Sequence, residues 1–354
     1  MTRLSVELSL ENLPLARAEL VGAVRALSEG RPISPSTETA PGLMSLGETP
    51  DDWGPRLAQR LALARRCLRE LPARSDAELE QAFRKAGAEG GSAAFRPLQG
   101  PRDPIDAEAV HRFARSYAAG GGTIDLRRPQ RRFWYRSTGP GDWSAFEEVG
   151  AVDRKSFDAR RMPRLPFQRP VSLPPRLGRV AANLAGVRAG HRVVDPFVGT
   201  GALLLEAALL GARVTGVDRD DEMVRGALRN FAEVGQTADA FRVSDAADAF
   251  SAPGGEGWDA VLTDPPYGRA SGSGGEPPHE LLRRVLPRWA ERVRPGGVVV
   301  VVLPGGEDPL GVEWVRTVGV QDRVHRSLTR EFRVYERRFD PRTGAATEHL
   351  VQGS

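Results

Sequence analysis

From Arg179 onward the sequence alternates between short apolar runs and longer amphipathic segments, and this alternation restricts the possible folds more than any other feature. Strands are indicated by the runs HRVVD, RVTGVD, AFRVSDA, WDAVLTD and VVVVVLP, and helices by residues 202–211, 220–235 and 280–294. Strands separated by helices of this length form parallel β-α-β units with right-handed crossovers. The pattern therefore predicts an α/β fold with a doubly wound sheet. Near the end of the chain, residues 322–330 and 331–339 read as two further strands that pair antiparallel.

Residues 1–150 differ in character and predict one or two small α+β units, with a sheet covered on one side by helices. RLSVELS reads as a strand, and the expected helices are residues 15–27, 51–71, 75–87 and 106–122. Ser75 and Glu78 form a capping box at the start of the third of these helices. Residues 32–50 read as a loop or disordered excursion, and TIDLRRP and RRFWYRS as a strand pair.

A basic segment, residues 154–179, lies between these two regions. It holds eight basic residues, five prolines and one acidic residue, Asp158. A solvated linker is one interpretation. The other is an electrostatic contact surface for a polyphosphate backbone, which we favour because the prolines keep the charges on an extended strip. Its candidate RNA-binding residues are Arg154, Lys155, Arg160, Arg161, Arg164 and Arg169.

Composition excludes several other classes of protein. The 354 residues contain one cysteine, Cys67, and five scattered histidines, so we expect neither a disulfide framework nor a metal site. No apolar run is long enough to cross a bilayer, and the N-terminus does not resemble a signal peptide, so we expect a cytoplasmic protein with no membrane partner. The net charge is +4, and almost all the basic residues are arginine, which suits phosphate and base contacts.

The stretch VVDPFVGTGALLLEA predicts a cofactor loop between a strand and a helix, with glycines at Gly199 and Gly201. Asp195, Asp218 and Asp245 each end one of three successive strands, where carboxylates can accept hydrogen bonds from ribose hydroxyls and an adenine amino group. Each aspartate could instead cap a helix. Because G-x-G-x-x-G is absent, S-adenosylmethionine fits this pattern better than a nicotinamide cofactor.

The motif TDPPYG follows the strand WDAVL and predicts the catalytic site. Two prolines cannot continue a strand, but they hold a rigid turn that presents carbonyl oxygens beside the Asp264 carboxylate. Such acceptors can grip the two N–H bonds of a planar amino group on a nucleobase, while Tyr267 offers a face on which an unstacked base can rest. Methyl transfer to that nitrogen then needs positioning and electrostatics only. The alternative is a rigid turn with no catalytic role.

At these residues the chain resembles a known family. VVDPFVGTGALLLEA, GVDRD and TDPPYG are similar to motifs of class I methyltransferases that modify the N2 amine of guanosine in RNA. The segment DRKSFDARRMPRLPFQRPVSLPPRLGRVAANLAGV resembles the stretch before the catalytic domain of archaeal tRNA guanosine-10 N2-methyltransferases. The resemblance is specific over residues 150–270.

This resemblance implies that residues 1–150 form a ferredoxin-like unit and a tRNA-binding THUMP domain. It also implies that residues 151–178 are a basic linker and that residues 179–354 form the Rossmann-like methyltransferase domain. The sheet of that domain would have seven strands, mostly parallel, with an antiparallel last strand. By position, Asp264, Pro265, Pro266 and Tyr267 would be catalytic. S-adenosylmethionine would be held by Asp195, Pro196, Phe197, Gly199, Thr200, Gly201, Asp218, Arg219, Asp245 and Ala246.

The sequence thus predicts a monomeric cytoplasmic enzyme that methylates the exocyclic amine of one guanosine in tRNA, at position 10, once or twice. Two alternatives within the same class stay open: another guanosine of tRNA or ribosomal RNA, and the N6 amine of adenine in DNA or RNA. A third alternative is an RNA-binding protein whose methyltransferase fold is inert.

Overall fold

The computed structural model describes residues 1–29, 31, 36–98, 107–139, 141–161, 164–169, 172–250, 257–266, 276–306, 308, 311–325 and 328–338. Its chain divides into two compact units. The N-terminal unit comprises Met1–Leu13 and Pro32–Asp153, and the C-terminal unit comprises Pro14–Arg31 and Arg154–Ser354. The C-terminal unit thus takes in residues 14–31, which include most of one helix, as well as most of the basic segment that follows residue 153.

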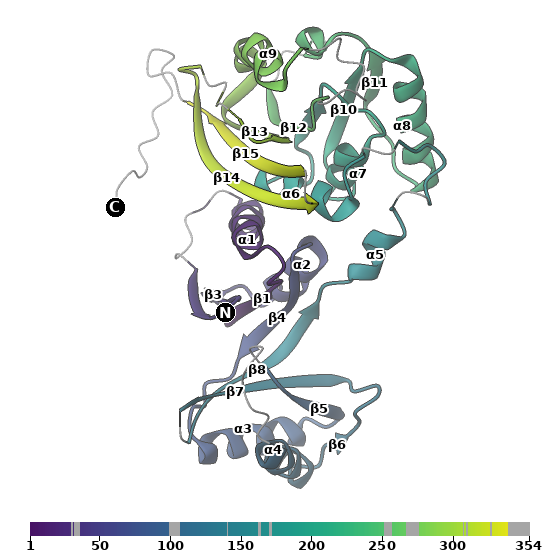
Figure 1. Cartoon of the computed structure of the whole chain (residues 1–354). Helices are drawn as coiled ribbons and strands as arrows, with labels where there is room; N and C mark the ends of the chain where they lie inside the picture. Colours follow the sequence, from purple (N-terminus) through teal and green to yellow (C-terminus); the bar gives the residue numbers. More distant parts are fainter. Residues whose placement is uncertain are drawn as a thin grey trace. The chain divides into compact units, whose positions relative to one another are not determined.

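Within the described residues, the N-terminal unit forms one eight-stranded sheet in the order β2-β3-β1-β4-β8-β7-β5-β6 (Figure 1). Its strands are β1 (Thr2–Leu8), β2 (Thr37–Ala40), β3 (Leu43–Thr49), β4 (Ala64–Glu70), β5 (Ser92–Pro97), β6 (Thr123–Ile124), β7 (Arg131–Gly139) and β8 (Asp142–Ala151). Its helices are α2 (Trp53–Arg60), α3 (Asp76–Ala88) and α4 (Ala107–Ala119). The capping box of Ser75 and Glu78 is confirmed at the start of α3.

Three expectations for this unit are wrong. Residues 32–50 are not simply a loop, because β2 and β3 form a hairpin there, with Leu43, Met44 and Leu46 buried. The predicted helix over residues 51–71 ends at Arg60, and β4 follows, because Leu61 adopts an extended conformation at the helix end. The predicted strand pair does not exist either: β7 pairs with β5 and β8, and β6 pairs with β5.

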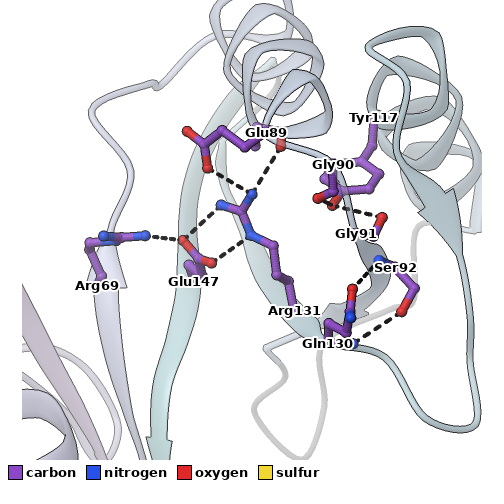
Figure 2. Close-up of polar contacts among 10 residues, drawn as sticks. Arg69, Glu89, Gly90, Gly91, Ser92, Tyr117, Gln130, Arg131 and Glu147 are labelled. Atoms are coloured by element: carbon purple, nitrogen blue, oxygen red, sulfur yellow. Dashed lines mark hydrogen bonds and ion pairs between the residues drawn. The ribbon is translucent and has the colours of Figure 1, made fainter.

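A partly buried ion pair ties four elements of the N-terminal unit together (Figure 2). The Arg131 guanidinium on β7 donates to both carboxylate oxygens of Glu147 on β8, to Glu89 and to the Ala86 carbonyl at the end of α3. Arg69 on β4 also donates to Glu147. Burial alone would raise the pKa of Glu147, but the hydrogen bonds from Arg131 and Arg69 outweigh burial and lower it. These contacts fix the sheet face beside α3 and α4, where an aromatic core lies.

The C-terminal unit contains the doubly wound sheet that the alternating pattern predicts. Among the described residues it has seven strands in the order β11-β10-β9-β12-β13-β15-β14. The strands are β9 (Arg192–Asp195), β10 (Arg213–Asp218), β11 (Ala240–Val243), β12 (Trp258–Thr263), β13 (Val293–Pro304), β14 (Trp314–His325) and β15 (Leu328–Arg337). The first five are parallel, and β15 runs antiparallel to both β13 and β14 (Figure 1). The predicted mostly parallel sheet with an antiparallel last strand is confirmed. The predicted strand over residues 322–330 instead spans the end of β14 and the start of β15.

Helices cover this sheet and connect its strands. They are α5 (Arg154–Asp158), α6 (Pro175–Leu184), α7 (Ala202–Ala208), α8 (Asp221–Glu233) and α9 (Pro278–Arg292), together with the short 3-10 helix η1 (Ala246–Asp248). Leu282, Val285 and Trp289 of α9 pack in one buried cluster with residues of β9, β12 and β13. Because the chain passes from β9 outward to β11 and then returns to β12, the order of the sheet reverses between β9 and β12. Ligands of doubly wound proteins bind at such a reversal.

The helix α1 (Leu13–Leu27) packs against α6 within the C-terminal unit. The Asn183 amide donates a 2.8 Å hydrogen bond to Glu19 Oε1, and both residues are 0% exposed. A Cβ placed on Gly22 would lie 2.1 Å from the Asn183 carbonyl oxygen, so the two backbones approach as closely as glycine allows. Arg25 forms an ion pair with Glu336 on β15 at 3.1 Å.

We expect Gly22→Ala to destabilise the protein by about 1–3 kcal/mol, because the new methyl group meets backbone atoms that no rotamer change can move away. In an isolated helix the same substitution would be favourable by about 1 kcal/mol, so the sign of the effect reports the contact. Thermal unfolding of the full chain measures it. Val21→Ala is the matched control, since Val21 lies on the same helix and is 60% exposed. An unchanged or raised Tm for Gly22→Ala would contradict this packing of α1.

Candidate active site

A cavity of about 590 Å³ lies at the carboxyl ends of β9, β10 and β12. Its lining brings together most of the residues that the sequence analysis selected. They are Asp195, Pro196, Phe197, Gly199, Thr200, Asp218, Arg219, Asp245, Ala246, Asp264 and Pro266. The position of the cavity follows from the sheet, because parallel strands bring the residues that follow them to one common edge.

The turn between β9 and α7 forms the floor of this cavity and depends on glycine. Gly201 has a φ of +83°, which side chains disfavour, and a Cβ there would lie 3.2 Å from Phe231. Gly199 has a φ of +50°, and its N–H donates to Asp218 Oδ2 at 3.0 Å. Gly201 does not itself line the cavity, so its role is to set the path of the turn.

Asp218 at the end of β10 holds two loops at once. Its Oδ2 accepts the Gly199 N–H, and its Oδ1 accepts the Asp220 N–H at 3.0 Å. Burial raises the pKa of Asp218, while these backbone donors act in the opposite direction. The capping role at α8 falls to Asp220, whose carboxylate accepts the Glu222 N–H at 2.8 Å. Asp218 is therefore left to face the cavity.

Asp245 both caps a helix and borders the cavity. It caps η1 by accepting the Ala247 N–H at 2.8 Å, and it also lines the cavity. Arg284 from α9 lies 3.7 Å from the Asp245 carboxylate and forms hydrogen bonds with Glu276 at 3.2–3.3 Å. The Asp245 side chain is 49% exposed, so it can exchange these partners for those of a ligand.

Asp195 at the end of β9 is the most deeply buried carboxyl group of the site, with 2% exposure. Its Oδ1 accepts hydrogen bonds from the Phe197 N–H at 3.0 Å and from the Thr263 hydroxyl at 2.9 Å. Burial raises the pKa of Asp195 to about 8, and the charges of Asp264 and Asp218 add to the increase. A neighbouring cation would favour the ionised form of this carboxyl group.

The predicted catalytic turn begins directly after β12. Asp264 and Pro266 line the same cavity as the glycine loop, and Pro265 between them is buried. Tyr267 lies outside the described residues. Asp264 therefore borders the same cavity as Asp195 and Phe197.

The structure separates the residues of the basic segment into three groups. Arg160 and the neighbouring Arg179 both donate to Glu206 on α7, which is 1% exposed, so their charges are used inside the unit. Arg169 lines the cavity, pairs with Glu222 at 2.6 Å and lies over the Phe167 ring. The side chains of Arg154, Lys155, Arg161 and Arg164 are exposed.

Sequence reasoning missed several residues that build the site. Ser172, Leu173, Met223, Glu276, Leu281 and Arg284 also line the cavity. Asn230 on α8 is fully buried and hydrogen-bonds to both backbone groups of Phe167 and to the Thr200 carbonyl, at 2.9–3.0 Å. Asn230 thereby joins the basic segment to the glycine loop. A detectable signal was its place beside Ala227 and Phe231 on the buried face of α8.

The described residues contain neither a metal-ligand cluster nor a membrane-spanning helix. No group of three or more histidine, cysteine, aspartate or glutamate side chains in these residues is placed to bind a metal ion. None of the helices in the described parts of the chain combines the length and apolar character needed to span a membrane.

Comparison with known proteins gives a consistent result for this unit. Residues 163–313 match the family described as RMKL-like, methyltransferase domain. The chain is 37% identical over 192 residues to the tRNA (guanine(10)-N2)-dimethyltransferase of Methanothermobacter thermautotrophicus, an alignment that covers 53% of this chain and 56% of the relative. It is also 37% identical over 190 residues to the protein of the same name from Pyrococcus abyssi, covering 52% of this chain and 56% of that relative. The chain thus spans about half the length of these curated relatives.

Among solved structures, TrmN from Thermus thermophilus aligns with a TM-score of 0.50 at 20% identity. The alignment covers 95% of this chain and 100% of that chain. At this level of identity the likeness shows a shared fold. Residues 163–313 are thus similar to the RMKL-like methyltransferase domain, and about half of the chain is similar to archaeal proteins named tRNA (guanine(10)-N2)-dimethyltransferase.

Proposed function

We propose that the protein transfers methyl groups from S-adenosylmethionine to the exocyclic N2 amine of a guanosine in tRNA, at position 10. One observation carries the proposal: the glycine loop, the aspartates that follow the strands, and the Asp264–Pro266 turn all border one cavity. The first two suit an adenosine-containing methyl donor, and the third suits an amino group as acceptor. The names of the similar archaeal proteins indicate the target nucleotide.

The residues present fit S-adenosylmethionine. A cavity of about 590 Å³ is of the size that small-molecule ligands occupy. The Asp218 carboxylate accepts the backbone N–H groups of Gly199 and Asp220, and because a carboxylate has about four lone-pair sites it can also accept a ribose hydroxyl. Asp245 can accept the adenine amino group, and Phe197, Met223 and Leu281 supply apolar wall. When bound, the cofactor supplies an electrophilic methyl group on a positively charged sulfur.

Asp264 would prepare the acceptor amine. The lone pair of an exocyclic amine is delocalised into the purine ring, so the nitrogen is a weak nucleophile. Acceptance of its two N–H bonds by the Asp264 carboxylate and a backbone carbonyl of the proline turn favours the geometry in which the lone pair is free to attack. After transfer the amine carries an additional proton, which Asp264 or water can take.

The remaining parts of the chain complete the proposal. Residues 1–150 would contain a ferredoxin-like unit and a THUMP domain that position the tRNA, and the exposed arginines within residues 151–178 would contact its backbone. We propose that the protein acts as a monomer in the cytoplasm. Either one or two methyl groups could be added to the same nitrogen.

Mass spectrometry of nucleosides tests the function directly. Unmodified tRNA is incubated with the protein and S-adenosylmethionine and digested to nucleosides, which identify the base and the methylated atom, and in parallel to oligonucleotides, which locate the position. Ribosomal RNA and duplex DNA are treated in the same way. N2-methylguanosine or N2,N2-dimethylguanosine at position 10 of tRNA supports the proposal. Methylation of adenine or of another RNA would overturn the assigned target, and tight tRNA binding with no cofactor binding would indicate an inert fold.

Asp264→Ala should lower kcat about 10²–10³-fold, because loss of one preorganised electrostatic contact in an active site has an effect of this size. The dissociation constant of S-adenosylhomocysteine should change by less than about threefold, since Asp264 acts on the amine. Asp248→Ala is the control, a substitution of a carboxylate with 65% exposure in the same unit. Equal losses of turnover and cofactor affinity would place Asp264 in the cofactor site instead.

Asp218→Ala should weaken S-adenosylhomocysteine binding about 10–100-fold in titration calorimetry, because hydrogen bonds to a charged group contribute about 1.5–3 kcal/mol each. The loss has two sources, the contact with the ribose and the hold on the Gly199 N–H. Asp239→Ala is the matched control, because Asp239 precedes β11 and pairs with Arg213 at the start of β10, at the opposite end of that strand from Asp218. If both variants bind with wild-type affinity, Asp218 has no part in cofactor recognition.

Replacing Arg161 and Arg164 with Ala should weaken tRNA binding and reduce the slope of log K against log salt by about 1–2, because each lost phosphate contact removes one released counterion. Arg160→Ala should behave differently. It removes donors to the buried Glu206 and should lower the free energy of unfolding by about 1.5–3 kcal/mol. If the salt slope of the double variant equals that of the wild type, Arg161 and Arg164 make no phosphate contact with tRNA.

A further inference from the structure

A single carboxylate oxygen connects the two loops that would hold the two reactants. Asp195 Oδ1 accepts the Phe197 N–H at 3.0 Å and the Thr263 hydroxyl at 2.9 Å. Phe197 belongs to the loop after β9, whereas Thr263 is the last residue of β12. The two donors are 66 positions apart in the sequence and share one atom.

Water has little access to this junction. Asp195 is 2% exposed and Thr263 is 0% exposed. If the Thr263 hydroxyl were removed, solvent could not easily supply a replacement donor. The bond is therefore a fixed connection between the loops, unlike an exposed hydrogen bond that exchanges with water.

Each donor continues directly into a wall of the cavity. Phe197 lines the cavity itself, within the proposed cofactor loop. Thr263 immediately precedes Asp264, which lines the cavity from the opposite strand of the sheet reversal. A shift of Thr263 relative to Asp195 would thus move the amine-binding carboxylate relative to the methyl donor.

We infer that Thr263 is a positioning residue for methyl transfer, which acts through Asp195 to set the distance between donor and acceptor. The inference rests on the proposed function, because it takes the glycine loop as the cofactor site and Asp264 as the amine-binding group. In-line transfer requires reacting atoms about 3–3.5 Å apart, and a misplacement of about 1 Å can lower the rate about 100-fold. A hydroxyl that holds two loops together can therefore matter without touching either reactant.

The Thr263 hydroxyl is not needed to hold β12 in the sheet. Its backbone pairs with Val301 in the parallel ladder between β12 and β13, and its neighbours Val261 and Leu262 are fully buried. Thr263→Val preserves the branched shape and the ladder while removing the donor. The substitution isolates the hydrogen bond from the packing.

We expect Thr263→Val to lower kcat about 10–100-fold, in line with the cost of a small misplacement of the reacting groups. The KM for tRNA and the dissociation constant of S-adenosylhomocysteine should stay within about threefold of wild type, because the contacts with each ligand are retained. Thr263→Ser restores a hydroxyl and should recover most of kcat. Thr215→Val on β10 is the matched control, since Thr215 is a buried threonine of the same sheet that lies away from the cavity.

Thr263→Val with wild-type kcat would overturn the inference. So would a fall in kcat that Thr263→Ser does not recover, or one accompanied by a much larger loss of Tm than in Thr215→Val, since either result would describe a structural role alone.

Hydrogen exchange provides a readout that does not depend on turnover. In the wild type, S-adenosylhomocysteine should slow exchange both in the glycine loop and in residues 258–266. In Thr263→Val the protection should remain in the loop and be lost from residues 258–266, because the connection between them is broken. Protection that persists in both segments of the variant would refute the coupling. If the wild type shows this coupling but methylates no guanosine in tRNA, the proposed function fails while the connection between the loops stands.

Discussion

The parallel pairing of β9 with its two neighbours is the constraint on which the rest of the site depends. Asp195 is aligned with Gly216 of β10, and Val193 and Val194 are aligned with the middle of β12. In this register the three strands end within two residues of one another, so the residues that follow them lie at one edge of the sheet. Asp195, Asp218 and Asp264, which end or follow these strands, consequently border one cavity, and their mutual repulsion and burial favour a ligand that carries positive charge nearby.

The chain accommodates these carboxyl groups by giving most of them backbone donors. Asp218 and Asp245 accept N–H groups of the loops that they border. Asp195, which is buried most deeply, accepts one backbone N–H and one hydroxyl. Its pKa is raised because these two hydrogen bonds do not fully compensate for the loss of solvation of the charged form. The same hydrogen bonds that stabilise the charges also shape the loops. The electrostatics and the geometry of the site are thus set by one group of contacts.

The doubly wound sheet and most of the cavity lining could be predicted from the sequence, because strand-helix alternation and residues directly after strands are local signals. Contacts between distant segments could not. Arg160 belongs to a dense basic run, and only the fold reveals that its partner is Glu206 on α7. The residues of β4 were predicted as the end of a helix over residues 51–71, but pairing with β1 and β8 places them in a strand, a contact that no local pattern specifies. Thr263 carried no signal of its own, since its role depends on a hydrogen bond to a different strand.

Because α1 packs in the C-terminal unit, that unit is built from two separate segments of the chain. A fragment designed from the boundary near Arg154 would contain the whole doubly wound sheet but would lack the helix that packs on α6. Asn183 would then be uncovered, and the surface fitted to Gly22 would face solvent. The covalent order therefore places a piece of the C-terminal unit between the first two strands of the N-terminal sheet. Neither unit can be excised as one continuous segment, and any swap of domains between relatives would have to transfer this helix together with the sheet that it covers.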